Sequence, residues 1–62
     1  MSSQDLIKLL NQNGWYEVRQ NGSHKVFKHD EKEGIVVVPS PRKDYPKGTL
    51  NAILKQAGIS KK

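Results

Sequence analysis

One histidine follows a tight-turn signal in a stretch rich in cations. His24 comes directly after Asn21-Gly22-Ser23, and an Asn-Gly pair is typical of two-residue hairpin turns. Imidazole both accepts and donates a proton near neutral pH. On a basic surface, His24 could take the proton of a ribose 2′-hydroxyl while cations stabilise the developing charge on the phosphate. The residues alone favour a simpler interpretation, in which His24 is a solvated histidine after a turn, because the signal for catalysis consists of a single residue.

The turn predicts which side chains of the hairpin share a face. If the loop is Asn21-Gly22, Arg19 pairs with His24, and paired residues lie on one face of the sheet. One predicted face is apolar and covered by helices: Tyr16, Val18, Phe27 and, near its edge, Lys25. The other is polar and accessible: Glu17, Arg19, His24, Val26 and Lys28.

Several further positions are candidates for contact with RNA. Cations in the loop at 40–46 and at the start of the second helix suit phosphates better than bases. The full set of expected RNA contacts is Arg19, Ser23, Lys25, Lys28, Arg42, Lys43 and Lys47. Nothing in the sequence resembles a P-loop, a serine triad or paired catalytic carboxylates.

Neither a metal site nor a cofactor is expected. His29 lies five positions from His24, so in an unbroken strand the two side chains face opposite ways. The acidic residues Asp30, Glu31 and Glu33 cluster where a solvated turn is the simpler interpretation.

The charge and length of the chain limit the classes of protein to which it can belong. The 62 residues, predicted to form one domain over 1–62, contain no cysteine and carry 11 Lys and Arg against 6 Asp and Glu, a net charge of +5. This excess favours a polyanionic partner, either nucleic acid or an acidic protein, although a basic protein can also simply be soluble. The sequence lacks a membrane span and a signal-peptide pattern, so a cytoplasmic location is expected.

Local signals predict an α+β fold. Ser2 and Asp5 suit a capping box, and Gly14 ends the first helix, with Trp15 folded back onto the core. Strands are expected at 16–20, 24–29 and 35–38. The last of these is apolar throughout, which predicts a well-covered strand. A second helix follows, with Thr49 as the expected N-cap and Gly58 as its terminator.

Short connections then place both helices on one face of a three-stranded antiparallel sheet. The opposite face is left to solvent or to a ligand.

The motifs together resemble a known family. A glycine-ended first helix, Asn-Gly-Ser-His, Val-Val-Val-Pro, Pro-Lys-Gly-Thr-Leu and Ile-Leu-Lys-Gln-Ala-Gly-Ile follow one another along nearly the whole chain. This combination is similar to the HicA toxins, also described as the YcfA-like family. The resemblance implies an α-β-β-β-α fold similar to the double-stranded RNA-binding domain (dsRBD). It also implies a type II toxin that cleaves mRNA, uses His24 as its catalytic residue and is neutralised by a HicB-type antitoxin.

The chain departs from the family pattern at one place. Many members carry a second histidine shortly after the Val-Pro of the third strand, where this chain has Ser40-Pro41. This argues against a two-histidine scheme. The leading hypothesis is a metal-independent endoribonuclease with His24 as the acid or base. The alternatives are a non-catalytic dsRBD-like RNA-binding module and a basic adaptor for an acidic protein.

Overall fold

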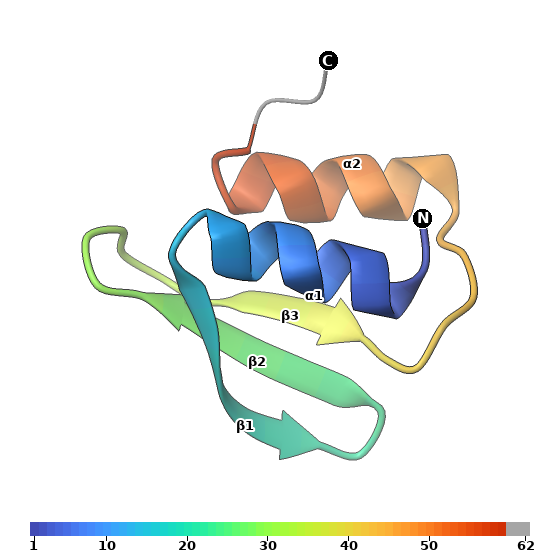
Figure 1. Ribbon diagram of the computed structural model, residues 1–62, viewed down its shortest axis with the longest axis horizontal. Coiled ribbons are helices and arrows are strands. Elements are labelled where there is room, and N and C mark those ends of the chain that lie inside the picture. Colours follow the sequence, from blue (N-terminus) through green and yellow to red (C-terminus); the bar gives the residue numbers. More distant parts are fainter. Residues whose placement is uncertain (60–62) are drawn as a thin grey trace.

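Two helices lie side by side on one face of a three-stranded antiparallel sheet in the computed structural model, which describes residues 1–59 (Figure 1). The elements are α1 (Ser3–Gln12), β1 (Trp15–Asn21), β2 (His24–His29), β3 (Val36–Pro39) and α2 (Lys47–Gln56). The strands lie in the order β1-β2-β3, so β2 is central. The predicted order and antiparallel sheet are therefore confirmed. Within residues 1–59, no helix is long and apolar enough to cross a membrane.

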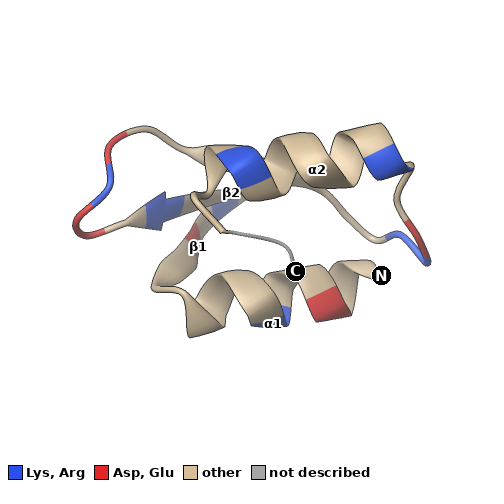
Figure 2. Ribbon diagram, turned by 90° about the horizontal axis from the view of Figure 1, so that it is seen from above, with Lys and Arg blue, Asp and Glu red and all other residues tan. Residues whose placement is uncertain are grey.

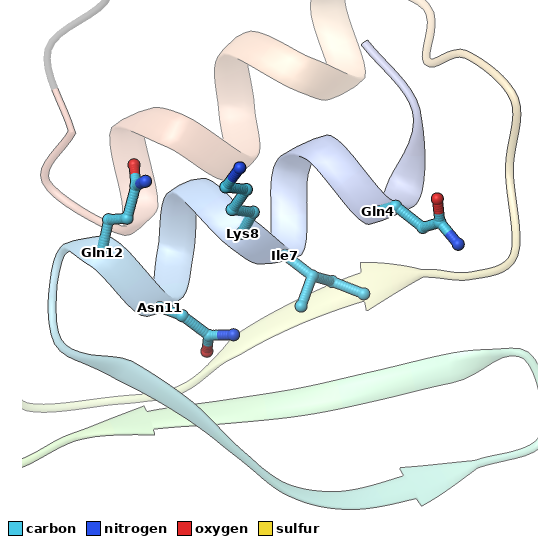
Figure 3. A pocket seen from close by; sticks show the side chains of 5 residues that line it. All are labelled: Gln4, Ile7, Lys8, Asn11 and Gln12. Atoms are coloured by element: carbon cyan, nitrogen blue, oxygen red, sulfur yellow. The ribbon is translucent and has the colours of Figure 1, made fainter.

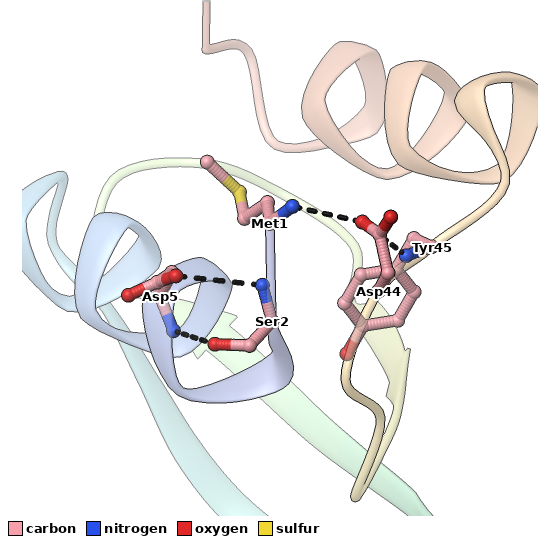
Figure 4. A network of polar contacts seen from close by, with 5 residues as sticks. All are labelled: Met1, Ser2, Asp5, Asp44 and Tyr45. Carbon is pink, nitrogen blue, oxygen red and sulfur yellow. Dashed lines mark hydrogen bonds and ion pairs between the residues drawn. The ribbon is translucent and has the colours of Figure 1, made fainter.

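The start of α1 forms as its sequence predicts. The Ser2 hydroxyl accepts from the Asp5 N–H at 3.2 Å, and the Asp5 carboxylate accepts from the Ser2 N–H at 3.4 Å (Figure 4). This capping box satisfies two N–H groups that the first turn of a helix leaves without partners. Gly14, at φ 90°, ends the helix in the left-handed region.

The start of α2 differs from the prediction. Pro46 is the N-cap, and its carbonyl accepts from the Leu50 N–H at 2.9 Å. Thr49 therefore lies inside the first turn, and its prediction as N-cap is wrong. The helix therefore begins at Lys47, three residues earlier than the hydroxyl signal indicated.

The hairpin turn lies one residue further along than predicted. Asn21 pairs with His24, so the loop is Gly22-Ser23, and only Gly22 has a positive φ, of 62°. A positive φ at the first loop position alone is the pattern of a type II′ turn. Arg19 pairs with Val26 rather than with His24. The pairing shifts by two residues, so Arg19 still shares a face with His24.

A β-bulge at Val18 reverses the faces of the residues before it. Arg19 pairs with Val26, but Glu17 pairs with Phe27, which leaves Val18 as the extra residue. An extra residue shifts the alternation of side chains by one. Tyr16 and Val18 are therefore 43% and 45% exposed, and their prediction on the helix-covered face is wrong.

The core lies between the helices and the covered face of the sheet. Phe27 is fully buried at its centre. The other members of this cluster are Leu6, Leu10, Trp15, Val36, Val38, Tyr45, Leu50, Ile53, Leu54 and Ala57. Ile35 and Val37, by contrast, are 41% and 37% exposed. The third strand is therefore well covered on the helix side, where Val36 and Val38 are fully buried, and open on the other side.

The loop from Ser40 to Pro46 is fastened at several points. The Tyr45 hydroxyl donates to the Pro39 carbonyl at 2.6 Å, and the Ser40 N–H donates to the Ser23 carbonyl at 2.7 Å. The Ser3 N–H donates to the Arg42 carbonyl at 2.8 Å. Asp44 pairs with the terminal amine at 2.8 Å (Figure 4). The loop is thus held against β3, the hairpin turn and α1.

Phe27→Ala is expected to lower the free energy of unfolding by about 3–5 kcal/mol, because it leaves a cavity at the centre of the core. Urea denaturation followed by circular dichroism measures this. The matched control on the exposed face, Val18→Ala, should cost less than about 1 kcal/mol. Equal losses in both variants would contradict the assignment of faces.

Tyr45→Phe is expected to cost about 0.5–1.5 kcal/mol at pH 7 through loss of the hydrogen bond to Pro39. Burial raises the pKa of Tyr45 above its ordinary value of 10.0, although the charge of Arg42 acts against this. The unfolded tyrosine ionises first, so as the pH rises past about 10 the wild type loses the stability that Tyr45 contributes, a loss that the variant lacks. Denaturation between pH 7 and 11 should show that the free energies of unfolding of the wild type and the variant become more similar as the pH rises. A difference that stays constant over this range would contradict the role of burial.

Candidate nucleic-acid interface

The turn between β1 and β2, the loop after β3 and the first turns of both helices lie at the same end of the molecule (Figure 1). Pairing of His24 with Pro39 brings these segments together, as does the bond between Ser40 and Ser23. We call this region, residues 19–25 and 39–47 with the first turn of α1, the hairpin end. The charged loop that follows β2 lies at the opposite end (Figure 2).

His24 is the first residue of β2 and is exposed. Because Phe27 and Lys25 lie on the helix-covered side, alternation puts the His24 side chain on the other face, which we call the open face. The prediction that His24 is accessible is confirmed. Arg19 belongs to the same face and lies diagonally across from His24, since their direct partners are Val26 and Asn21. Long side chains span such a diagonal.

A hollow of about 710 Å³ lies on the helix-covered side of the hairpin end. Its walls come from the first turns of α1, from β2 and from the loop after β3. We call it the basic groove; it is lined by Ser2, Ser3, Gln4, Ile7, Lys25, Ser40, Pro41, Arg42 and Lys43. Three of these side chains are cationic and none is acidic. A concave surface of this charge is suited to a phosphate or another anion.

The three cations of the groove are not equivalent. The Lys25 ammonium lies 3.2 Å from the Glu17 carboxylate, and its side chain is 24% exposed. Lys25 therefore lies on the covered side, near its edge, as predicted, and its charge is partly neutralised. Arg42 and Lys43 are exposed, and neither has an acidic partner among residues 1–59. They are the cations of the groove that are free to meet an anion.

The remaining predicted contacts fall in different places. Lys28 lies on the open face opposite Tyr16, four residues along β2 from His24, or about 13 Å at ~3.3 Å per residue. Ser23 is exposed in the turn, and Lys47 is exposed at the first position of α2. The structure therefore separates the predicted cations into an open-face pair, Arg19 and Lys28, and a set around the basic groove.

Sequence reasoning missed the contribution of Ser40. This residue is only 6% exposed, and its N–H holds the carbonyl of Ser23 next to His24. Ser40 stands at the position where the resemblance suggested a second histidine. The sequence did contain a signal for this contact. If β2 and β3 pair in an antiparallel way, the residue that follows Pro39 must lie beside the hairpin turn.

His29 has a structural role. Its ring lies edge-on to Trp15, with the ring centres 5.2 Å apart. Nδ1 accepts from the Glu31 N–H at 3.0 Å, so Nε2 carries the proton and donates to the Asn13 carbonyl at 2.9 Å. The prediction that His29 faces away from His24 is confirmed. Within residues 1–59, no three His, Cys, Asp or Glu side chains are grouped as a metal site would need.

A further hollow, of about 490 Å³, lies along the outer surface of α1. Figure 3 shows that all of its lining side chains leave this one helix: Gln4, Ile7, Lys8, Asn11 and Gln12. It holds a single cation and none of the predicted site residues. We assign it no function.

Comparison with known proteins agrees with this arrangement. A family model for the HicA toxin of bacterial toxin-antitoxin systems matches residues 3–59. The chain is also similar to a chain in the solved HicA3 and HicB3 toxin-antitoxin complex, with 36% sequence identity, a TM-score of 0.85 and coverage of 100% of both chains. No curated protein matches significantly. The chain therefore belongs to the HicA toxin family of bacterial toxin-antitoxin systems.

Proposed function

We propose that this protein is an endoribonuclease that cleaves mRNA in the cytoplasm and is neutralised by a HicB-type antitoxin. The observation that carries the proposal is the exposure of His24 at the hairpin end, with Arg19 as its diagonal neighbour on the open face. The similar chain comes from a complex of a toxin with its antitoxin, which supports the partner.

In the proposed reaction, neutral His24 takes the proton of a ribose 2′-hydroxyl. The oxygen attacks the adjacent phosphorus, the bond to the 5′-oxygen breaks, and a cyclic phosphate is left. Negative charge on the phosphate increases as this happens, and the guanidinium of Arg19 is placed to stabilise it. The reaction needs a proton donor for the departing 5′-oxygen.

Water is the donor that we assign to the leaving group. Lys28 shares the open face with His24, but its backbone lies about 13 Å along the strand, so it is not a direct neighbour of the histidine. Lys25 is directed to the other face and pairs with Glu17. Ser40, where the family pattern suggested a second histidine, is buried. The geometry thus argues against a second side chain in this role.

The basic groove is the proposed binding site for the RNA backbone beyond the cleaved phosphate. Arg42 and Lys43 extend from the loop that Ser40 ties to the hairpin turn. Lys47, at the start of α2, continues the positive surface along the same end of the molecule. These contacts would position the strand without reading its sequence.

His24→Ala is expected to abolish cleavage of a defined mRNA in excess EDTA, with the fold retained by circular dichroism. The matched control is the other histidine: His29→Gln alters the core side of the sheet and should keep cleavage wherever it stays folded. Gel analysis of the RNA measures both. A folded His24→Ala protein that still cleaves RNA would contradict the proposal. If the wild type bound the RNA but left it intact, the result would support the binding-module alternative.

Removal of both Arg42 and Lys43 is expected to weaken RNA binding and to lower its dependence on salt. Each phosphate contact contributes about 0.7 to the slope of log K against log salt for single strands, so Arg42→Ala with Lys43→Ala should reduce the slope by about 1.4. Titration of catalytically inactive His24→Ala protein with labelled RNA at several salt concentrations measures this. Lys8→Ala with Lys55→Ala removes the same charge elsewhere, and an equal change in that control would contradict the groove assignment.

A further inference from the structure

A hollow on the open face is lined by three apolar side chains and two cations. Its volume is about 470 Å³, and no acidic side chain lines it. We call it the open-face hollow; its lining residues are Val18, Arg19, Val26, Lys28 and Ile35. A mostly apolar hollow of this size with a few polar groups is typical of sites that hold one small chemical group.

The open-face hollow continues along the central strand from the proposed catalytic position. His24, Val26 and Lys28 are successive residues of β2 on the open face, because side chains alternate between the two faces. Arg19 pairs with Val26, so the residue proposed to stabilise the cleaved phosphate also lines the hollow. Lys28 lines it further along the strand. A ligand in the hollow therefore lies next to the phosphate that is attacked.

The floor and walls of the hollow are aliphatic. Val26 is only 7% exposed although both helices lie on the other face of the sheet. It is absent from the core cluster, so its neighbours on the open face cover it. Val18 and Ile35 are 45% and 41% exposed, so water reaches the walls. Nucleobases pack well against apolar side chains of this kind, because the contact removes apolar surface from water.

Tyr16 adds an aromatic surface at the end of the hollow where Lys28 lies. The two residues pair directly, so their side chains share the open face. Tyr16 is 43% exposed, and its hydroxyl donates to the Asp30 carboxylate at 3.0 Å. This hydrogen bond restricts the ring before any ligand binds, which lowers the entropic cost of binding. The bases of single-stranded RNA stack on exposed aromatic rings.

The combination of charge and apolar surface fits a nucleotide. Proteins bind single-stranded nucleic acid through cations that follow the phosphates and through aromatic or apolar surfaces that receive the bases. Here Arg19 and Lys28 supply the cations, and the apolar surface is that of Val26 with its neighbours. An acidic peptide would also meet the cations. The continuity of the hollow with the catalytic position favours the substrate, because the strand on either side of the cleaved phosphate has to lie there.

We propose that the open-face hollow, with Tyr16 at its end, is the subsite for the nucleotide next to the cleaved phosphate. The base packs over Val26 and stacks on Tyr16, and Lys28 binds the next phosphate along the strand. The identity of the ligand rests on the proposed function. The basic groove, on the other side of β2, then holds the backbone on the other side of the cleavage point.

The test compares two single strands of equal charge: an oligouridine RNA, and a ribose-phosphate oligomer of the same length that lacks bases. Binding is measured by fluorescence anisotropy in the His24→Ala protein, which the proposed mechanism makes inactive. This protein should bind oligouridine about tenfold or more tightly than the abasic oligomer. Adding Tyr16→Ala should weaken oligouridine binding about tenfold and change abasic binding by less than about twofold. Tyr16→Phe keeps the ring and should keep the preference.

Two further variants test the apolar wall and the second cation. Ile35→Ser removes an exposed wall of the hollow and should lower the same preference, and it serves if Tyr16→Ala fails to fold. Lys28→Gln should weaken the binding of both oligomers and lower the slope of log K against log salt by about 0.7. Lys55→Gln is the matched control, because it removes the same charge from an exposed position of α2 and should leave the slope unchanged.

The outcomes separate the subsite from the proposed function. Equal affinities of the His24→Ala protein for the two oligomers, or a preference that persists in Tyr16→Ala and Ile35→Ser, would overturn the subsite. Cleavage of mRNA by the wild type would then leave the proposed function intact. A wild type that neither cleaves mRNA nor binds either oligomer would overturn both. If base-dependent binding required Tyr16 but the wild type left mRNA intact, the cleavage proposal would be wrong and the hollow would remain a base-binding site.

Discussion

Burial of Phe27 between the helices and the sheet is the constraint on which the other features depend. It anchors the central strand, which hydrogen-bonds on both sides and so cannot rotate. Every second residue of that strand must then face away from the core. The exposure of His24, the central position of Val26 and the separation of Lys25 from Lys28 all follow from this one orientation. Core packing and the candidate site are therefore set by the same alternation.

The order of elements was predictable because its signals are local. The capping box at Ser2 and the glycine at the end of each helix depend on a few neighbouring residues, and they appeared where expected. The bulge at Val18 was not predictable, since no glycine or proline marks it and it depends on how two strands fit the core. The faces of Tyr16 and Glu17 were wrong for that reason. The predicted faces of His24 and Arg19 were correct because a one-residue shift of the turn moves each cross-strand partner by two positions, which keeps it on the same face.

The two sides of β2 serve different chemistry. On the covered side, Arg42 and Lys43 border a groove whose charged side chains are all cationic. On the open side, cations flank aliphatic side chains. Under the proposed function, the groove on the covered side holds the RNA backbone. His24 lies on the open face, whereas the next residue, Lys25, lines the groove on the covered side.

The bond between the Ser40 N–H and the Ser23 carbonyl, at 2.7 Å, lowers the entropic cost of binding the proposed RNA ligand. A free hairpin tip and a free loop would each lose conformational entropy when a strand settled between them. Here the hairpin tip, the loop and β3 are already connected by hydrogen bonds, including the one that the Tyr45 hydroxyl donates to the Pro39 carbonyl. Much of the ordering is thus completed when the protein folds. The candidate site is thus preorganised, because His24 and the basic groove are held at a fixed separation before any ligand binds.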